Sequence, residues 1–297
     1  MTRPDLLPIV ERAARFVLNR RGFQSRTVPT PLAEIHTYEA AGEGTLPTTV
    51  VLHGIGSSAT SFGRMLACLR PHVRRLIALD LPGHGFSGTP AGRVTPDTLY
   101  QSVSAALDVL VDEPVLLIGN SLGGALALQH AMENPAKVSS LALLSPAGAR
   151  VSEMEWEALV RAFRIESMDE ARSMLHRLYH RMPWYMSAFA PGLRATMQRQ
   201  AVRDILGSAT LDNLPAPERL GELSMPVLLL WGRSERVMPP SALAYFRQHL
   251  PPRTLIEEPT GFGHCPHFDD PARLAGRLIA FARQVERDTV LVPSAQN

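Results

Sequence analysis

The chain has 297 residues, of which 45% are hydrophobic and 20% are charged, and its formal net charge is +2. These proportions are ordinary for a globular enzyme with a sizeable core, and so small a net charge argues against nucleic acid as a partner. The two cysteines, Cys68 and Cys265, have neither the spacing of a metal site nor the number needed for a disulfide framework. We therefore expect free thiols in a reducing, cytoplasmic compartment.

Residues 1–30 are predicted to form an amphipathic helical segment. Six apolar residues recur there at helical spacing: Leu6, Ile9, Val10, Ala13, Phe16 and Val17. Glu11, Arg12 and Arg15 interrupt the stretch, which makes it a poor signal peptide, and no apolar run approaches the roughly 18–20 residues that span a bilayer. We expect the helix to pack against the main domain, without a stable membrane anchor; a helix lying on a cap or on a membrane surface is the alternative.

Short apolar runs then alternate with longer helical patterns. The predicted strands are 34–38, 48–52, 75–79, 115–118, 140–144, 227–231 and 254–257. The predicted helices are 62–70, 95–111, 122–133, 241–250 and 271–285. Continuous apolar strands separated by helices predict a mostly parallel sheet with helices on both faces.

The alternation stops over residues 146–224, where we find amphipathic helical stretches and no convincing strand. The simplest organisation is one α/β core, residues 31–145 and 225–297, with a helical insertion over 146–224. The insertion contains six of the 11 methionines and two of the three tryptophans. Methionine suits an adaptable apolar lining, so the stretch 182–189 is expected to face the substrate through Met182, Trp184, Met186 and Phe189.

The stretch Gly119-Asn120-Ser121-Leu122-Gly123 fits the pattern G-x-S-x-G. In this pattern a serine occupies a sharp strand-to-helix turn, and the flanking glycines leave room for a strained backbone. The predicted strand 115–118 lies before it and the predicted helix 122–133 after it. We therefore predict that Ser121 is a nucleophile at the carboxyl edge of the sheet.

A serine hydroxyl needs a base, and the base needs a carboxylate. His264 is the predicted base because it lies in a glycine-flanked loop after the last predicted strand; His267, three residues later, is expected to belong to the packing of that loop or to the surface. Glu235, which follows the strand 227–231, is the predicted carboxylate, and residues 145–148, the other usual place for the acid, contain none.

Acyl transfer also needs N–H donors for a developing oxyanion. The backbone N–H groups of Ile55, in the turn after strand 48–52, and of Leu122, just after the nucleophile, are the predicted pair. His53 precedes that turn, so we expect it to shape the loop through local hydrogen bonds.

In this order, "LHGIGSS", "LDLPGHGFSG", "GNSLGG", "LLWGRSERVMP" and "GHCPHFDDP" resemble the serine hydrolases of the α/β-hydrolase fold, over roughly residues 34–285. The resemblance implies an eight-stranded, mostly parallel sheet and a helical cap inserted after strand six. It also implies a structural role for Asp80. The chain departs from the family at Glu235, where most members carry aspartate.

Within this family, Asn120 in "GNSLGG" is similar both to lipases and esterases and to carbon–carbon bond hydrolases of meta-cleavage products. We expect hydrolysis of a carboxylic ester with an apolar acyl chain, through Ser121, His264 and Glu235, with no metal and no cofactor. A carbon–carbon bond hydrolase is the first alternative, and Arg150, Arg161, Arg164 and Arg194 are its candidate cations. A non-catalytic small-molecule receptor is the second. The oligomeric state stays open.

Overall fold

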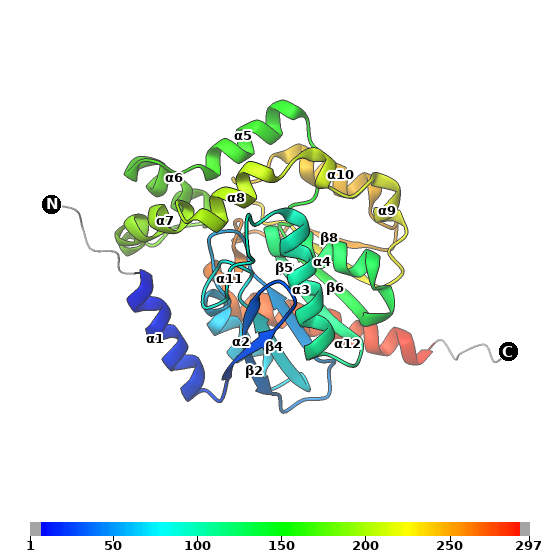
Figure 1. The fold of residues 1–297 in the computed structure, drawn as a ribbon. Helices are drawn as coiled ribbons and strands as arrows, with labels where there is room; N and C mark the ends of the chain where they lie inside the picture. Colours follow the sequence, from blue (N-terminus) through cyan, green and yellow to red (C-terminus); the bar gives the residue numbers. More distant parts are fainter. Residues whose placement is uncertain (1–6, 292–297) are drawn as a thin grey trace.

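A computed structural model describes residues 7–291, so that Leu6 and the outer ends of the predicted N-terminal segment and core lie outside the described residues. An eight-stranded sheet runs through the molecule in the order β1-β2-β4-β3-β5-β6-β7-β8 (Figure 1). The strands are β1 (Gln24–Pro29), β2 (Glu34–Ala41), β3 (Thr49–Leu52), β4 (Arg75–Leu79), β5 (Val115–Asn120), β6 (Val138–Leu144), β7 (Val227–Leu230) and β8 (Leu255–Glu257). Strand β2 is antiparallel to β1 and β4, and the remaining pairs are parallel. The α/β-hydrolase architecture and its mostly parallel sheet are confirmed.

The helical segment predicted over residues 1–30 is wrong in its second half, because helix α1 ends at Arg20 and strand β1, which the apolar pattern does not predict, follows at Gln24–Pro29. The sequence of β1, QSRTVP, is largely polar, and only Val28 is fully buried. It lies at the edge of the sheet, with Val28 opposite Ile35 of β2. An edge strand with one buried side chain carries no apolar run, so the pattern that reveals the central strands does not reveal this one.

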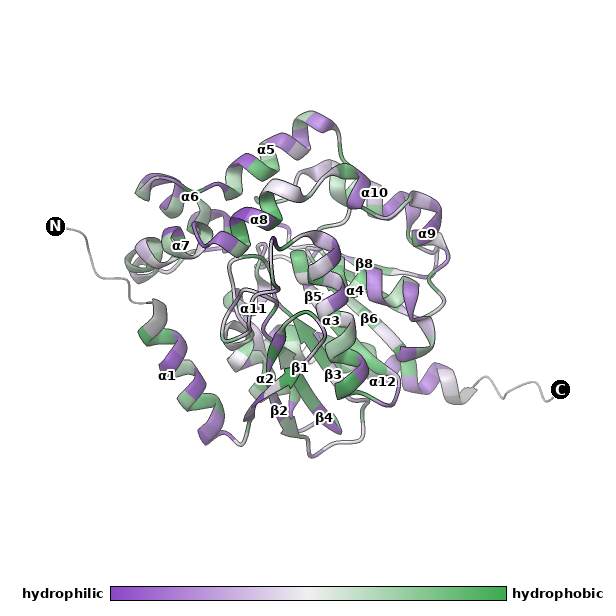
Figure 2. Cartoon of the chain, in the orientation of Figure 1, coloured by the Kyte–Doolittle hydropathy of each residue, from purple (hydrophilic) through white to green (hydrophobic). Residues whose placement is uncertain are grey.

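Side chains of the central strands alternate between two cores. Val50 and Leu117 belong to one core, and Val51 and Leu116 belong to the other. The first core is covered by α3 (Pro96–Leu110), α4 (Leu122–Glu133) and α10 (Pro240–His249). The second is covered by α2 (Gly63–Leu69), α12 (Pro271–Leu291) and the end of α1 (Leu7–Arg20). Figure 2 shows the central strands mainly in the hydrophobic colour, as strands buried on both faces require.

Helical elements occupy the segment between β6 and β7. They are α5 (Glu153–Phe163), α6 (Met168–Leu178), the 3-10 helix η3 (Trp184–Phe189), α7 (Ala190–Met197), α8 (Gln200–Ser208), the 3-10 helix η4 (Leu211–Asn213) and α9 (Pro217–Gly221). Figure 1 shows α5 to α8 gathered at one end of the sheet. Ser152 and Ser167 cap the first two helices in capping boxes, which fixes where each helix begins. Within residues 7–291, no helix is long and apolar enough to cross a membrane.

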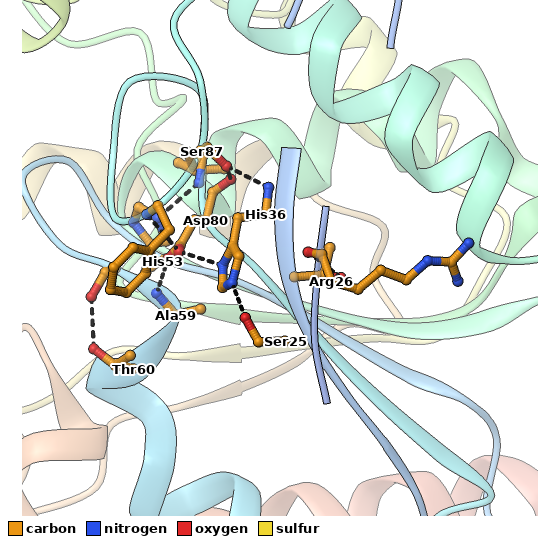
Figure 3. A network of polar contacts seen from close by, with 12 residues as sticks. Ser25, Arg26, His36, His53, Ala59, Thr60, Asp80 and Ser87 are labelled. Atoms are coloured by element: carbon orange, nitrogen blue, oxygen red, sulfur yellow. Dashed lines mark hydrogen bonds and ion pairs between the residues drawn. The ribbon is translucent and has the colours of Figure 1, made fainter. Parts of the chain in front are cut away.

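Asp80, at the end of β4, holds together the loops beside the site (Figure 3). Its carboxylate accepts hydrogen bonds from the N–H of Ala59 at 2.7 Å and of Phe86 at 3.0 Å, and from Nδ1 of His36 at 2.9 Å. The side chain is fully buried, so these partners replace the water that the carboxylate loses. Asp80 therefore has a structural role, as the family resemblance implied.

Asp80→Ala is expected to lower the free energy of unfolding by about 3–5 kcal/mol, because it leaves buried donors without an acceptor. Urea denaturation of the two proteins measures the difference. Asp288→Ala, on the exposed side of α12, is the control and should change stability by no more than about 0.5 kcal/mol. Equal effects of the two substitutions would contradict the structural role of Asp80.

Candidate active site

Ser121 lies at the turn from β5 into α4 with a backbone φ of 53°. A positive φ is strained for a side chain other than glycine, by about 1–3 kcal/mol. The turn is held by the end of β6, because the Ser121 N–H donates to the Leu144 carbonyl at 3.1 Å and its carbonyl accepts from the Ala147 N–H at 2.9 Å. A Cβ at Gly119 would stand 2.3 Å from the Gly123 carbonyl oxygen, so the turn also requires glycine there. The predicted strand–serine–helix turn is present.

Asn120, the residue before this serine, fixes the histidine loop. Its side-chain amide donates to the carbonyls of Leu144 at 2.9 Å and of His264 at 3.0 Å, and the residue is buried. Both N–H bonds of the amide group are thereby used on main-chain carbonyls. Asn120 thus joins the serine turn to the loop of His264, a connection that the sequence pattern did not reveal.

His264 and Glu235 form a buried pair. Nδ1 of His264 lies 2.8 Å from Oε2 of Glu235, and both side chains are 3% exposed. The other carboxylate oxygen accepts from the N–H groups of Val237 at 2.7 Å and Met238 at 3.0 Å. Burial acts to raise the pKa of Glu235, but the electrostatic interaction with His264 and the hydrogen bonds from His264 and the Met238 N–H outweigh burial and lower the pKa below its usual range. An ionised carboxylate only accepts, so His264 donates from Nδ1, which leaves Nε2 of the neutral ring as the acceptor.

Two alternatives to these assignments are a surface Glu235 paired with a neighbouring arginine and a base at His267 in place of His264; the contacts of the described residues support neither. Arg233 and Arg236 donate to backbone carbonyls at Glu258 and Tyr179, and Glu235 is not their partner. His267 is buried with its ring 4.0 Å from the Phe62 ring, and burial, with the nearby His264, lowers the pKa of His267 to about 3. A neutral ring stacked in the core fits the predicted packing role.

The loop after β3 lies against the serine turn. A Cβ at Gly54 would stand 3.2 Å from Cβ of Ser121, so this loop brings the Ile55 backbone next to the serine. His53 shapes the loop as predicted, because Nδ1 pairs with the Gly54 carbonyl at 2.8 Å and Nε2 accepts from the Leu81 N–H at 2.9 Å. Leu122 is the first residue of α4, and N–H groups in a first helical turn have no partner within the helix.

Ser121 and His264 both line one cavity of about 320 Å³. Its wall is mainly apolar, with hydroxyls of the segment 57–61 on one side, and it is completed by the inserted helices through Phe163, Leu175, Leu178, Tyr179, Met186, Phe189 and Leu193. Among the described residues that line it there is no lysine or arginine. The described residues also include no cluster of three metal-ligating side chains.

Two of the four residues expected to face the substrate lie in the cavity wall, and two do not. Met186 and Phe189 lie in the cavity wall, whereas Met182 packs on the core beside it and Trp184 is 87% exposed. Helix α1 contributes Val10, Glu11 and Ala14 to the same wall. Helical periodicity shows that such a helix exists but not what it packs against, which is why the sequence did not place α1 at the site.

Comparison with known proteins identifies the family. The sequence model of the alpha/beta hydrolase fold matches residues 47–271, well over half of the chain. The chain is 30% identical over 218 residues to a 2-hydroxy-6-oxononadienedioate/2-hydroxy-6-oxononatrienedioate hydrolase of Comamonas testosteroni, covering 67% of this chain and 74% of that protein. It is 26% identical over 271 residues to a pimeloyl-[acyl-carrier protein] methyl ester esterase of Nitrosospira multiformis, covering 82% and 97%.

Among solved structures, a membrane phospholipase A, a novel bacterial virulence factor, superimposes with a TM-score of 0.81 at 25% identity. The match covers 95% of this chain and 93% of that one. The strand order, the strained serine turn and the family match agree, and the chain therefore belongs to the α/β-hydrolase fold family of hydrolases.

Proposed function

We propose that the chain is a serine carboxylesterase that hydrolyses esters with an apolar acyl chain through Ser121, His264 and Glu235. The observation that carries the proposal is the shared cavity: a strained serine and a histidine paired with a buried carboxylate both line it, and its wall is mainly apolar. The proposed nucleophile, the proposed base and space for an acyl chain lie at one cavity, which supports the proposal.

In the proposed reaction, Nε2 of His264 takes the proton of the Ser121 hydroxyl as its oxygen bonds to the ester carbonyl carbon. Glu235 accepts a hydrogen bond from Nδ1 of His264, which lies 2.8 Å from Oε2, and stabilises the imidazolium that forms. The negative oxygen of the tetrahedral intermediate accepts hydrogen bonds from the N–H groups of Ile55 and Leu122.

Collapse of the intermediate breaks the bond to the alkoxy group, which leaves as an alcohol with the proton from His264. Water then attacks the acyl-serine and gives its proton to Nε2, and the second collapse releases the carboxylic acid and restores the Ser121 hydroxyl. Every proton that moves passes through His264, so the cycle needs no other acid or base.

The cavity wall favours an ester over a carbon–carbon substrate. The substrates named for the Comamonas testosteroni relative are dioates and so carry two carboxylates, which a protein normally holds with arginine or lysine. The candidate cations do not line this cavity among the described residues: Arg150 donates to Pro215 and Leu214, and Arg194 donates to Glu166. The esterase of Nitrosospira multiformis and the phospholipase A structure also support ester chemistry by their names.

A fluorophosphonate probe should label the wild-type protein at Ser121 and leave Ser121→Ala unlabelled, because the probe reacts with a serine activated by a base. Ester hydrolysis by the variant should fall on the order of 10⁶-fold. Ser57→Ala, which removes another serine from the same cavity wall, is the control and should keep the label. A wild-type protein that takes no label would contradict the proposal and favour the non-catalytic receptor.

Glu235→Gln should lower kcat by about 10⁴-fold with little change in KM, because the neutral amide cannot stabilise the imidazolium or fix its tautomer. Glu235→Asp keeps the charge but shortens the side chain, so its kcat should lie between those of the wild-type protein and Glu235→Gln. The exposed Glu258→Gln is the control in the same steady-state assay. If Glu235→Gln retained more than about a tenth of the activity, another group would be supporting His264.

A series of nitrophenyl esters should show kcat/KM rising by about fourfold per added methylene until the cavity is filled, since each buried methylene contributes about 0.8 kcal/mol. Phe189→Ala should move the preferred chain length upward by enlarging the wall. Trp184→Ala removes an aromatic residue of the same 3-10 helix that lies outside the wall, and should leave the profile unchanged. Activity on acetate alone, or on a diketone acid and no ester, would refute the assignment.

A further inference from the structure

Helix α1 presents its apolar side to solvent. Leu18 on its inner side is buried, together with the partly buried Glu11, Ala14 and Arg15. On the outer side Ile9 is 64% exposed and Phe16 is 65% exposed, and Val10, Ala13 and Val17 are also exposed. A helix that only packs on its own domain turns its apolar stripe inward. This one does the reverse, so its outer side requires a different explanation.

The second exposed apolar group belongs to η3. Trp184 is 87% exposed and Tyr185 is 53% exposed. Both α1 and η3 supply residues to the wall of the cavity that Ser121 lines, and α1 contacts α7, which follows η3 directly. Figure 1 shows α1 (dark blue) at the side of the molecule, below α6 and α7. The two exposed groups, Ile9, Val10, Phe16 and Val17 with Trp184 and Tyr185, therefore flank one cavity, and we call them the rim.

The exposed charges beside the rim are positive, whereas Glu11 of α1 is partly buried in the cavity wall. Arg12, Arg20 and Arg181 are exposed beside the rim. Residues 171–203, which include η3 and α7, contain six arginines and no aspartate or glutamate. Asp169, Glu170 and Asp204 flank this range, and Arg172 pairs with Asp169, so five of the six arginines form no ion pair with a carboxylate among the described residues. A basic surface with exposed aromatic and aliphatic residues matches the headgroup region of an anionic lipid bilayer, where tryptophan and tyrosine rings partition and arginines meet lipid phosphates.

We propose that the rim is a membrane-docking surface, by which α1 and η3 lie on an anionic lipid bilayer with the cavity facing its headgroups. A second copy of the chain would explain the apolar residues but not the accumulation of like charge, since two such rims would repel one another. An anionic bilayer accounts both for the exposed apolar residues and for the arginines beside them.

Co-sedimentation with vesicles tests the proposal. Every protein carries Ser121→Ala, which leaves lipid intact and makes binding independent of hydrolysis and so of the proposed function. Binding to vesicles of equal parts phosphatidylglycerol and phosphatidylcholine should exceed binding to pure phosphatidylcholine by about fivefold for each arginine engaged, and should weaken as salt rises. Phe16→Glu and Trp184→Glu should each lower binding to the vesicles by at least about tenfold, because an aromatic side chain that would insert into the bilayer is replaced by a charge.

Val109→Glu is the matched control. Val109 is a 59% exposed apolar residue on α3, away from the rim, and its substitution should leave vesicle binding as it was. Thermal unfolding of each variant verifies that it is folded. Binding that is absent, equal on the two kinds of vesicle, or lowered as much by Val109→Glu as by Phe16→Glu would overturn the proposal. A dimer in analytical ultracentrifugation that Phe16→Glu dissolves, with no vesicle binding, would overturn it in favour of self-association.

Discussion

The buried contact between the Glu235 carboxylate and the His264 imidazole is the constraint on which the arrangement of the site depends. A carboxylate taken out of water is destabilised by several kcal/mol unless donors replace its hydration. Here three donors do so, at 2.7 to 3.0 Å: two backbone N–H groups of the Glu235 loop and Nδ1 of His264. Because the two residues belong to different loops, after β7 and after β8, the pair persists only if those loops are held within hydrogen-bonding distance of each other.

The hydrogen bonds that hold the loops also hold the inserted helices. Asn120 joins the His264 carbonyl to the end of β6. Asp269 accepts from the N–H of Gly263 at 2.7 Å and of His180 at 2.8 Å, and Arg236, next to Glu235, donates to the carbonyls of Tyr179 and His180. The segment that follows α6 is thus bonded to both loops. The cavity wall and the histidine therefore take their positions from the same contacts, and a change in one is transmitted to the other.

The parts that could be predicted from sequence are those determined by local geometry. The serine turn follows from a strand, two glycines and a helix adjacent in the chain, and the predicted order of Ser121, Glu235 and His264 follows from strands recognisable by continuous apolar runs. Contacts between distant segments leave no such local signal. The amide of Asn120 donates to a carbonyl 144 positions away in the chain. Helix α1 completes a cavity wall that exists only in the folded chain. Trp184, an aromatic residue in a stretch expected to line the pocket, is exposed to solvent. Strand β1 could not be predicted for a different reason: it lies at the edge of the sheet and is largely polar, so it has no apolar run to recognise.

Arginines lie in the elements around the cavity, but no lysine or arginine lies among the described residues of its wall. A wall that contains Glu11 but no cation among the described residues disfavours a carboxylate held deep in the cavity, because an unpaired charge in an apolar site is strongly penalised. Arginines outside the wall act at longer range and are screened by salt, so in the proposed docking they would attract the protein to an anionic surface without contacting the reacting group. The proposed preference for a neutral acyl chain and the proposed docking on an anionic bilayer thus rest on different sets of side chains in one region of the molecule.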